Sequence, residues 1–327
     1  MKNSSNKGIT IIIRKIWGGV KKQLKKIPII YKPYLALVTL KLEIDSKRNP
    51  EMQTRKLYKR STGRELNITS PKAFTEKLQW LKLNKYWYHP LVSRCADKYA
   101  VRSYVEEKGC EEILTKLYGI WDKADDIEWS DLPDKFVLKC NHGSGYNIVC
   151  ENKKLFNKSQ AIKKLNHWLH KEYGVKFVEQ GIYGNIHRKV IAEEYIETDD
   201  GLPPHDYKFF CSQGKVKMLF VAQERINNAA KFDFYYPDWT YINVKNHFET
   251  HGRDNPPHKL EMMIHYAEKL SESFPIVRVD LYNEGDRVLF GELTFLHFGG
   301  YQPFNPDSFD FEMGQMFPSK EELERWT

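Results

Sequence analysis

The last hairpin of the sequence places charged side chains inside two strongly apolar runs. The segment IVRVDLYNEGDRVLFGELTF predicts two strands joined by a turn at Asn283–Asp286. Side chains alternate along a strand, so Arg278 and Asp280 point to the same face. Glu292 lies on the returning strand, twelve positions after Asp280. Unpaired charges in such surroundings are costly, so these side chains must find partners in the folded chain.

Two carboxylates that face each other across a hairpin offer the oxygen ligands that Mg²⁺ binds. Asp280 and Glu292 are therefore candidate metal ligands, and the Thr294 hydroxyl is a candidate third ligand. The alternative is a buried Arg–Asp–Glu network with no chemistry, since structural ion networks are common. Both interpretations stay open on these residues alone.

A glycine turn near the middle of the chain is flanked by two further apolar runs. In KFVLKCNHGSGYNIVC, residues 135–150, the turn resembles a phosphate-binding loop but lacks the P-loop signature G-x-x-x-x-G-K-[ST]. A metal site that uses His142, Cys140 and Cys150, or an ordinary hairpin, are the other interpretations. No second cluster is spaced to complete a four-ligand zinc site.

Two lysines favour a nucleotide at this turn. Lys139 lies in the strand before it, and Lys98 lies upstream on one expected helix, RCADKYAVRSYVEEKG, that ends at Gly109. With the two carboxylates, they make a plausible triphosphate cradle. The strand VIAEEYIE carries Glu193 and Glu194, and its backbone offers hydrogen bonds to a purine edge.

The remaining pattern predicts an α+β chain with mostly antiparallel strands in its second half. A helix is expected from Pro71, with Ser70 as its cap. Further helices are expected over 159–174 and 257–274, and a hairpin over 206–223.

The order of these motifs resembles the ATP-grasp superfamily. The segments FTEKLQWLK, ADKYAVRSYV, LPDKFVLKCNHGSGYNIV, IAEEYIE, DYKFF, FPIVRVDLY and FGELTF are similar to its TupA-like branch, from about residue 68 to 314. That branch is named for teichuronopeptide biosynthesis and is often found with capsule or other surface-polysaccharide functions. The resemblance implies an ATP-grasp fold, in which two α+β subdomains clasp ATP.

The resemblance implies an ATP-binding role for the matching residues. Lys98 and Lys139 resemble the two lysines that contact the phosphates. The mobile loop that covers them corresponds to residues 142–147, which include His142, Gly143, Ser144 and Gly145. The hinge strand that reads adenine corresponds to Glu193, Glu194, Tyr195 and Ile196. Either Asp206 or Glu197 is expected to serve the ribose.

Catalytic and metal-binding roles follow from the same resemblance. Arg278 resembles the arginine that stabilises the transferring phosphoryl group, and Lys139 is expected to help neutralise the moving charge. Lys208 resembles a basic residue near phosphate or acceptor. Asp280 and Glu292 resemble the Mg²⁺ ligands. Many family members have Asn two positions after the second carboxylate; Thr294 stands there in this chain, which leaves the third ligand open.

The implied reaction is ATP- and Mg²⁺-dependent joining of a carboxylate to an amine through an acyl phosphate, in surface or capsular polysaccharide biosynthesis. A sugar or an amino acid would supply either group. Three alternatives remain: a glycosyltransferase, a phosphotransferase acting on a glycan, and a degenerate scaffold. The chain has no Asp-x-Asp pair, which one metal-dependent class of glycosyltransferase needs. The retained charged residues argue against degeneracy.

Positive charge is concentrated at the N-terminus. The first 60 residues carry 16 Lys and Arg against three acids, within a net charge of +8, so the rest of the chain is mildly acidic. No apolar run approaches the ~18–20 residues of a spanning helix. Residues 8–36 suit contact with an anionic membrane surface, where a lipid-linked glycan would be a partner; a solvated or packed basic arm is the alternative. No nucleic-acid recognition pattern accompanies the charge.

Five cysteines without C-x-x-C spacing predict a reduced, cytoplasmic protein, which the basic arm would place at the inner face of the plasma membrane. The expected divisions are a basic arm over 1–67, a helical region over 68–133, a lid subdomain with the glycine loop over 134–193, and a core with the Mg²⁺ site over 194–327.

Overall fold

The computed structural model describes residues 28–223 and 230–327, in two compact units that divide after Pro50. In the first unit, helix α2 (Pro28–Arg48) carries Lys47 and Arg48 in its last turn. No helix within the described residues has the length and apolar character to cross a membrane. Most of the basic segment expected to touch a membrane surface, residues 8–27, lies outside the described residues, so that expectation stays a prediction.

The second unit begins with α3 (Pro50–Thr62), which was expected to belong to the arm. Its Tyr58 packs in a small buried cluster with Leu66 and Tyr301, which explains why this helix belongs to the body. The structural division therefore falls at residue 50, whereas the expected one was at 67.

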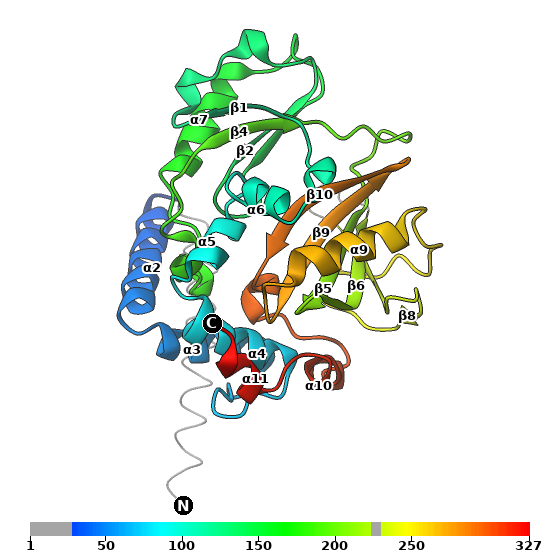
Figure 1. Cartoon of the computed structure of the whole chain (residues 1–327). Helices are drawn as coiled ribbons and strands as arrows, with labels where there is room; N and C mark the ends of the chain where they lie inside the picture. Colours follow the sequence, from blue (N-terminus) through cyan, green and yellow to red (C-terminus); the bar gives the residue numbers. More distant parts are fainter. Residues whose placement is uncertain (1–27, 224–229) are drawn as a thin grey trace, which may run out of the picture. The chain divides into compact units, whose positions relative to one another are not determined.

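A four-stranded antiparallel sheet forms the upper layer of this unit in Figure 1. Its order is β1 (Leu117–Trp121), β4 (Val190–Glu194), β2 (Phe136–Cys140) and β3 (Asn147–Cys150). Helix α7 (Lys158–Leu169) packs on it through buried apolar side chains such as Leu165. We call residues 117–194 the lid; its first strand precedes the expected boundary at residue 134.

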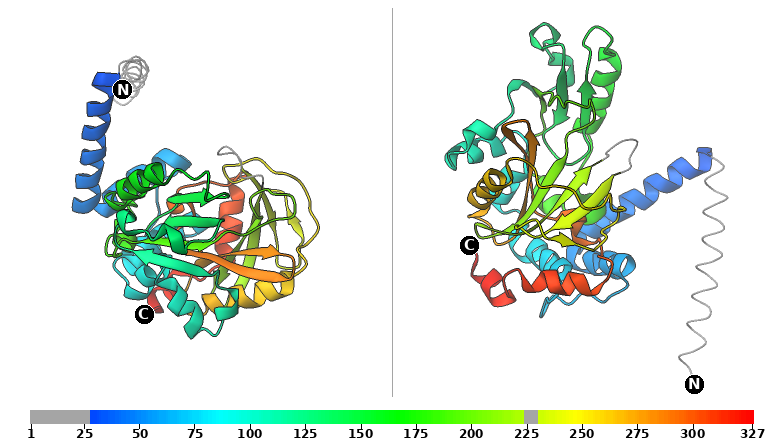
Figure 2. Two further views of the ribbon diagram at one scale, coloured as in Figure 1. Left: turned by 90° about the horizontal axis from the view of Figure 1, so that it is seen from above. Right: turned by 90° about the vertical axis from the view of Figure 1, so that its right-hand side faces the viewer.

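A six-stranded antiparallel sheet forms the second layer. Its order is β10 (Arg287–Thr294), β9 (Val277–Glu284), β5 (Asp206–Ser212), β6 (Lys215–Gln223), β7 (Lys231–Tyr235) and β8 (Tyr241–Ile242). Helix α9 (Leu260–Ser271) packs against one face. The right-hand view of Figure 2 shows the lid sheet above this sheet. Helices with two antiparallel sheets confirm the predicted α+β class.

Shorter helices surround the large sheet. Their bounds are α4 (Phe74–Leu81), α5 (Pro90–Ala96), α6 (Val101–Glu107), α8 (Gln180–Tyr183), α10 (Ser308–Gln315) and α11 (Lys320–Arg325). A π-helical turn (Lys82–Tyr86) follows α4. Phe74 packs edge-on against Phe210 of β5, with ring centroids 5.6 Å apart, and so attaches α4 to the large sheet.

Two local predictions differ from the structure. Helix α4 begins at Phe74, not at Pro71, because the Glu76 carboxylate accepts hydrogen bonds from the backbone nitrogens of Lys72 at 2.9 Å and Ala73 at 3.1 Å. This caps the helix at a later residue. In the last hairpin, the strands continue to Glu284 and resume at Arg287, so the turn is shorter than predicted.

The expected single helix through Lys98 is two helices. Asp97 Oδ1 accepts hydrogen bonds from the backbone nitrogens of Tyr99 at 2.8 Å and Ala100 at 3.2 Å. An Asp side chain that binds nearby backbone nitrogens competes with a continuing helix. The chain therefore leaves α5, turns at Lys98, and starts α6 at Val101.

Candidate active site

Charged side chains form a row across three neighbouring strands of the large sheet. Lys208 on β5 lies opposite Asp280 on β9, and Asp280 lies opposite Glu292 on β10. A bulge between Phe290 and Glu292 interrupts the ladder at this point. Opposed residues of paired strands stand about 5 Å apart. The row therefore brings one cation and two carboxylates onto one face.

Arg278 secures this row from the next position on the same face. Its Nε and Nη2 atoms donate to Asp280 Oδ1 and Oδ2, each at 2.7 Å, a two-point ion pair that fixes the planar guanidinium. Nη2 also donates to Thr294 Oγ1 at 2.9 Å and lies 3.8 Å from Glu292 Oε1. The Lys208 ammonium forms a second ion pair with Asp280 Oδ2. Asp280 is thus held between two cations.

Lys98 reaches the row from the turn between α5 and α6. Its backbone nitrogen donates to the Asn141 carbonyl at 2.9 Å, which ties the turn to the end of β2. Its ammonium donates to the Gly143 carbonyl at 2.7 Å and lies 3.1 Å from Glu292 Oε2. Lys98 therefore connects the glycine loop with the large sheet.

The electrostatics of the two carboxylates differ. Burial raises the pKa of Glu292, but the charges of Lys98, Lys208 and Arg278 outweigh burial and lower this pKa to about 2. Burial also raises the pKa of Asp280, and the ion pairs with Arg278 and Lys208 oppose that effect. Glu292 therefore stays ionised at all physiological pH values.

Two residues of the site were missed from the sequence. Arg278 Nη1 lies 2.8 Å from His297 Nδ1, and His297 Nε2 lies 2.9 Å from Asn246 Oδ1. Arginine only donates, so Nδ1 accepts and Nε2 carries the proton that it donates to Asn246. Burial, then the charge of Arg278, lowers the pKa of His297 well below its usual value. Only the position of His297 soon after the strand that carries Glu292 hinted at this role.

Lys139 lies on the lid strand β2 and faces the same space. Its ammonium is 2.6 Å from Glu193 Oε2, and Glu193 Oε1 is 3.5 Å from Arg102 Nη1. Arg102 is anchored by donating to the Thr115 carbonyl at 2.7 Å. Glu193 is buried and lines none of the cavities described below, so it positions Lys139 through this ion pair.

The glycine loop depends on left-handed backbone at Gly143 (φ +79°) and Gly145 (φ +76°). A Cβ atom on Gly143 would lie 2.3 Å from the Tyr173 ring, whereas one on Gly145 would meet open space. Ser144 and Gly145 line the central cavity. Glycine is thus required at position 143 both for its φ and for close packing.

His142 is buried and lines none of the three cavities at this site. Only 1% of its surface is exposed, and its ring packs edge-on against Tyr146 with centroids 5.5 Å apart. Burial, then the charge of Arg188, lowers its pKa to about 4. The structure therefore gives His142 a place in the lid core, which differs from its expected contact with the nucleotide.

A cavity of about 640 Å³ lies between the glycine loop and the charged row. Of the predicted site residues, it is lined by Lys98, Lys139, Ser144, Gly145, Asp206, Lys208, Arg278, Asp280 and Glu292. Its other walls include aromatic rings and His297. The predicted cations and carboxylates therefore converge on a single space, although they come from both layers.

A second cavity, of about 410 Å³, adjoins the first and shares Lys139, Asn147 and Tyr282 with it. Its walls include the apolar side chains of Val137, Val149 and Phe290 and the predicted hinge residues Glu194, Tyr195 and Ile196. An apolar slot beside a backbone strand suits a flat base such as a purine.

Ion pairs distinguish the two ribose candidates and fix the hinge. Glu197 is exposed, and its Oε2 lies 2.6 Å from Lys135 Nζ. Asp206 is buried and lines the central cavity, and its Oδ2 lies 2.6 Å from Lys208 Nζ. Glu194 Oε1 lies 2.7 Å from Arg287 Nη1, which joins the hinge to β10. Of the two candidates, only Asp206 lines the central cavity.

The donor atoms here fit Mg²⁺ in kind. The candidate set is all oxygen, and Mg²⁺ usually takes one or two carboxylates, with phosphate oxygens and water completing its coordination. The described residues contain no group of three or more His, Cys, Asp and Glu side chains able to hold a metal by themselves. The carboxylate oxygens of Glu292 lie 3.1 Å or more from their partners Lys98, Thr294 and Arg278. Both carboxylate oxygens of Asp280, in contrast, accept hydrogen bonds from Arg278 at 2.7 Å. Glu292 is thus the more available ligand.

Comparison with solved structures returns ATP-grasp ligases at low identity. D-alanine–D-alanine ligase from Bacillus anthracis is 16% identical over 62% of this chain and 57% of that one, with a TM-score of 0.34. L-amino acid ligase from Bacillus licheniformis is 13% identical over 67% and 47%, with a TM-score of 0.41. The chain thus spans less than two thirds of these structures. No curated protein matches it.

The family comparison is more specific. The model of the TupA-like ATP-grasp family matches residues 76–318, which include the charged row, the glycine loop and the hinge. The match covers well over half of the chain and agrees with the order of motifs in the sequence. The chain belongs to the TupA-like ATP-grasp family.

Proposed function

We propose that this protein is an ATP- and Mg²⁺-dependent ligase that joins a carboxylate to an amine. One observation carries the proposal: an apolar cavity beside the hinge opens into a larger cavity where Lys98, Lys208 and Arg278 surround two carboxylates. A base fits the first cavity, and phosphates together with a metal fit the second.

ATP would bind with adenine between the strand 194–196 and the apolar residues of β2, β3 and β10. Asp206 would accept hydrogen bonds from the ribose. Lys98 and Lys139 would contact the phosphates, and Ser144 and Gly145 would cover them. Bound Mg²⁺, held by Glu292 with Asp280, would neutralise charge on the phosphate oxygens.

The chain's own cations would promote phosphoryl transfer to the substrate carboxylate. Arg278 is already held in place by Asp280, Thr294 and His297. Its guanidinium would therefore stabilise the negative charge that develops on the transferring phosphoryl group without first having to reorient. Lys208 would hold the attacking carboxylate close to this arginine. The glycine loop would exclude water from the resulting acyl phosphate, which an amine then attacks.

The substrates proposed are a sugar or an amino acid that takes part in surface or capsular polysaccharide assembly. This part of the proposal rests on the family's frequent association with such functions. The basic segment 8–36 would hold the enzyme at the inner face of the plasma membrane, where a lipid-linked glycan is available.

Hydroxylamine trapping tests the ligase. The protein is incubated with Mg-ATP, hydroxylamine, and a panel of uronates and amino acids, and hydroxamate is measured together with ADP. We expect hydroxamate that depends on one acid and that is lost in Arg278→Ala. Transfer of a sugar from a nucleotide sugar without ATP would instead support the glycosyltransferase. ADP formation with a stable phosphorylated glycan and no hydroxamate would support the phosphotransferase.

A further inference from the structure

A third cavity, of about 190 Å³, opens beside the charged row. It shares Lys98, Ser144, Arg278, Glu292 and Phe298 with the central cavity, so the two spaces meet where these side chains lie. Apart from these shared residues and Thr294, its walls are mostly apolar or aromatic. This position would place a small second substrate next to an activated carboxylate in the central cavity.

Glu179 is the feature of this cavity that the proposed reaction has not used. It lies just before α8, and only 5% of its surface is exposed, yet it lines the cavity. Within the described part of the chain, its carboxylate has no hydrogen bond and no ion pair. A buried carboxylate without a direct partner is costly, so the site is poised to receive a cation or a donor.

No cation of the described residues forms an ion pair with this carboxylate, although the charge of Lys82 acts on it and lowers its pKa. Lys82 is fully buried nearby, but its ammonium donates to the Tyr301 hydroxyl at 2.8 Å and to the Phe177 carbonyl at 3.2 Å. The two cations in the cavity wall, Lys98 and Arg278, contact Glu292 and Asp280. Glu179 is therefore a carboxylate of the cavity wall that no cation of the described residues contacts directly.

We propose that this cavity binds a primary amine as its ammonium ion, and that Glu179 contacts the ammonium and accepts one of its protons. The inference rests on the ligase activity proposed above and names the class of its second substrate. The rings of Tyr173 and Tyr183, whose centroids are 4.9 Å apart, line the same cavity, and aromatic rings attract cations. Its volume of about 190 Å³ corresponds to about six water molecules, which is enough for an alkylammonium end.

The proton balance of the step is complete. The ammonium gives one proton to Glu179 and becomes a neutral amine. The nitrogen lone pair then forms the C–N bond at the acyl carbon, and the C–O bond to the phosphoryl group breaks, with its electron pair leaving on phosphate. The departing phosphate takes the second nitrogen proton. Burial raises the pKa of Glu179 and the charge of Lys82 opposes that effect, so the raised pKa favours proton uptake by this carboxylate.

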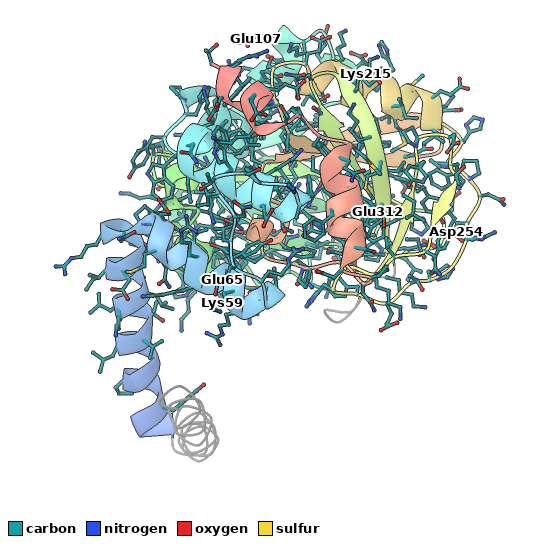
Figure 3. All side chains as sticks on the ribbon, turned by 90° about the horizontal axis from the view of Figure 1, so that it is seen from below. Lys59, Glu65, Glu107, Lys215, Asp254 and Glu312 are labelled. Carbon is teal, nitrogen blue, oxygen red and sulfur yellow. The ribbon has the colours of Figure 1, made fainter. Side chains whose placement is uncertain are left out.

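Glu179→Gln tests this assignment, because it preserves size and removes the charge. Hydroxylamine is largely uncharged at neutral pH, so it does not need a carboxylate to deprotonate it. With the acid identified by trapping, we expect the variant to form hydroxamate within about threefold of the wild-type rate. Amide formation with glycinamide or ethanolamine is expected to fall at least twentyfold. Glu312→Gln, on the exposed side of α10, is the matched control and should change neither rate (Figure 3).

The outcomes separate the two proposals. Equal amide rates in wild type and Glu179→Gln, or a parallel loss of hydroxamate and amide, would overturn the role of Glu179. If the wild type yields no hydroxamate with any acid, the ligase proposal fails, and the cavity is judged by binding alone. Saturation-transfer NMR with methylammonium should then show contact with the wild type and none with Glu179→Gln; equal signals would reject the amine site.

Discussion

Lys98 and Glu292, which are far apart in the sequence, form an ion pair of 3.1 Å between the turn after α5 and the strand β10. The same ammonium donates to the Gly143 carbonyl at 2.7 Å. One side chain therefore connects the glycine loop with a candidate Mg²⁺ ligand. Any change at Lys98 is expected to alter both the position of the loop and the charge on the carboxylate.

Replacing Lys98 with Met should weaken ATP binding and loosen the loop. A charged hydrogen bond contributes about 1.5–3 kcal/mol, so we expect the KM for ATP to rise at least tenfold. ATP titrations of ADP release measure this. Lys215→Met is the control, because its side chain is 70% exposed and pairs weakly with Glu268 at 3.5 Å; Figure 3 labels this surface position. An unchanged KM in Lys98→Met would contradict the proposed phosphate contact.

The two carboxylates of the row should respond differently to neutralisation. Asp280→Asn removes the two-point partner of buried Arg278, while Lys208 keeps its ion pair with Asp206; we expect a loss of about 3–5 kcal/mol in the free energy of unfolding. Glu292→Gln removes a carboxylate that three cations stabilise, but its side chain is 30% exposed, so the unfolding temperature should fall less than in Asp280→Asn, and activity should need more Mg²⁺. Thermal unfolding and Mg²⁺ titration of ADP release separate these effects. If both variants lose the same stability, the two carboxylates do not differ in the way proposed.

The glycine loop offers a matched pair of substitutions. Both Gly143 and Gly145 have positive φ, so alanine at either position costs about 1–2 kcal/mol. Only at Gly143 would the new Cβ also collide with the Tyr173 ring. We therefore expect Gly143→Ala to lower the rate of ADP release far more than Gly145→Ala. Comparable rates in the two variants would mean that the loop does not pack on Tyr173 during the reaction.

The lid should lose stability in mild acid because of His142. Its pKa is about 4 in the folded chain, below the ordinary histidine value of 6.5, so the unfolded chain binds a proton first as the pH falls. The stability that depends on neutral His142 is present above pH 6.5 and is lost as the pH falls toward 4. His142→Gln should flatten this dependence. Fluorescence of Trp168, whose ring stacks on Tyr146 with centroids 5.2 Å apart, reports on unfolding of the lid. If the stability of the wild type and of His142→Gln falls equally steeply with pH, His142 is not the cause.

Much of the fold followed from local patterns, and the exceptions have local causes. The hairpins at 206–223 and 277–294 were predicted from alternating apolar residues, because their turns need only neighbouring residues. The helix through Lys98 was predicted to be continuous, because helical spacing persists on both sides of Asp97. The bonds from Asp97 to two backbone nitrogens break it, and they depend on the turn that the Asn141 carbonyl holds.

Strand alternation alone dictates which charges share a face, since Arg278 and Asp280, or Glu292 and Thr294, are two residues apart in the chain. Which strands stand beside each other depends on the folded sheet, and so do the meetings of Lys208 with Asp280 and of Lys98 with Glu292. Folding also placed His142 in the lid core and Glu179 in the wall of the third cavity. No local sequence pattern predicts either placement, because the burial of a single polar residue depends on chain segments that only folding brings together.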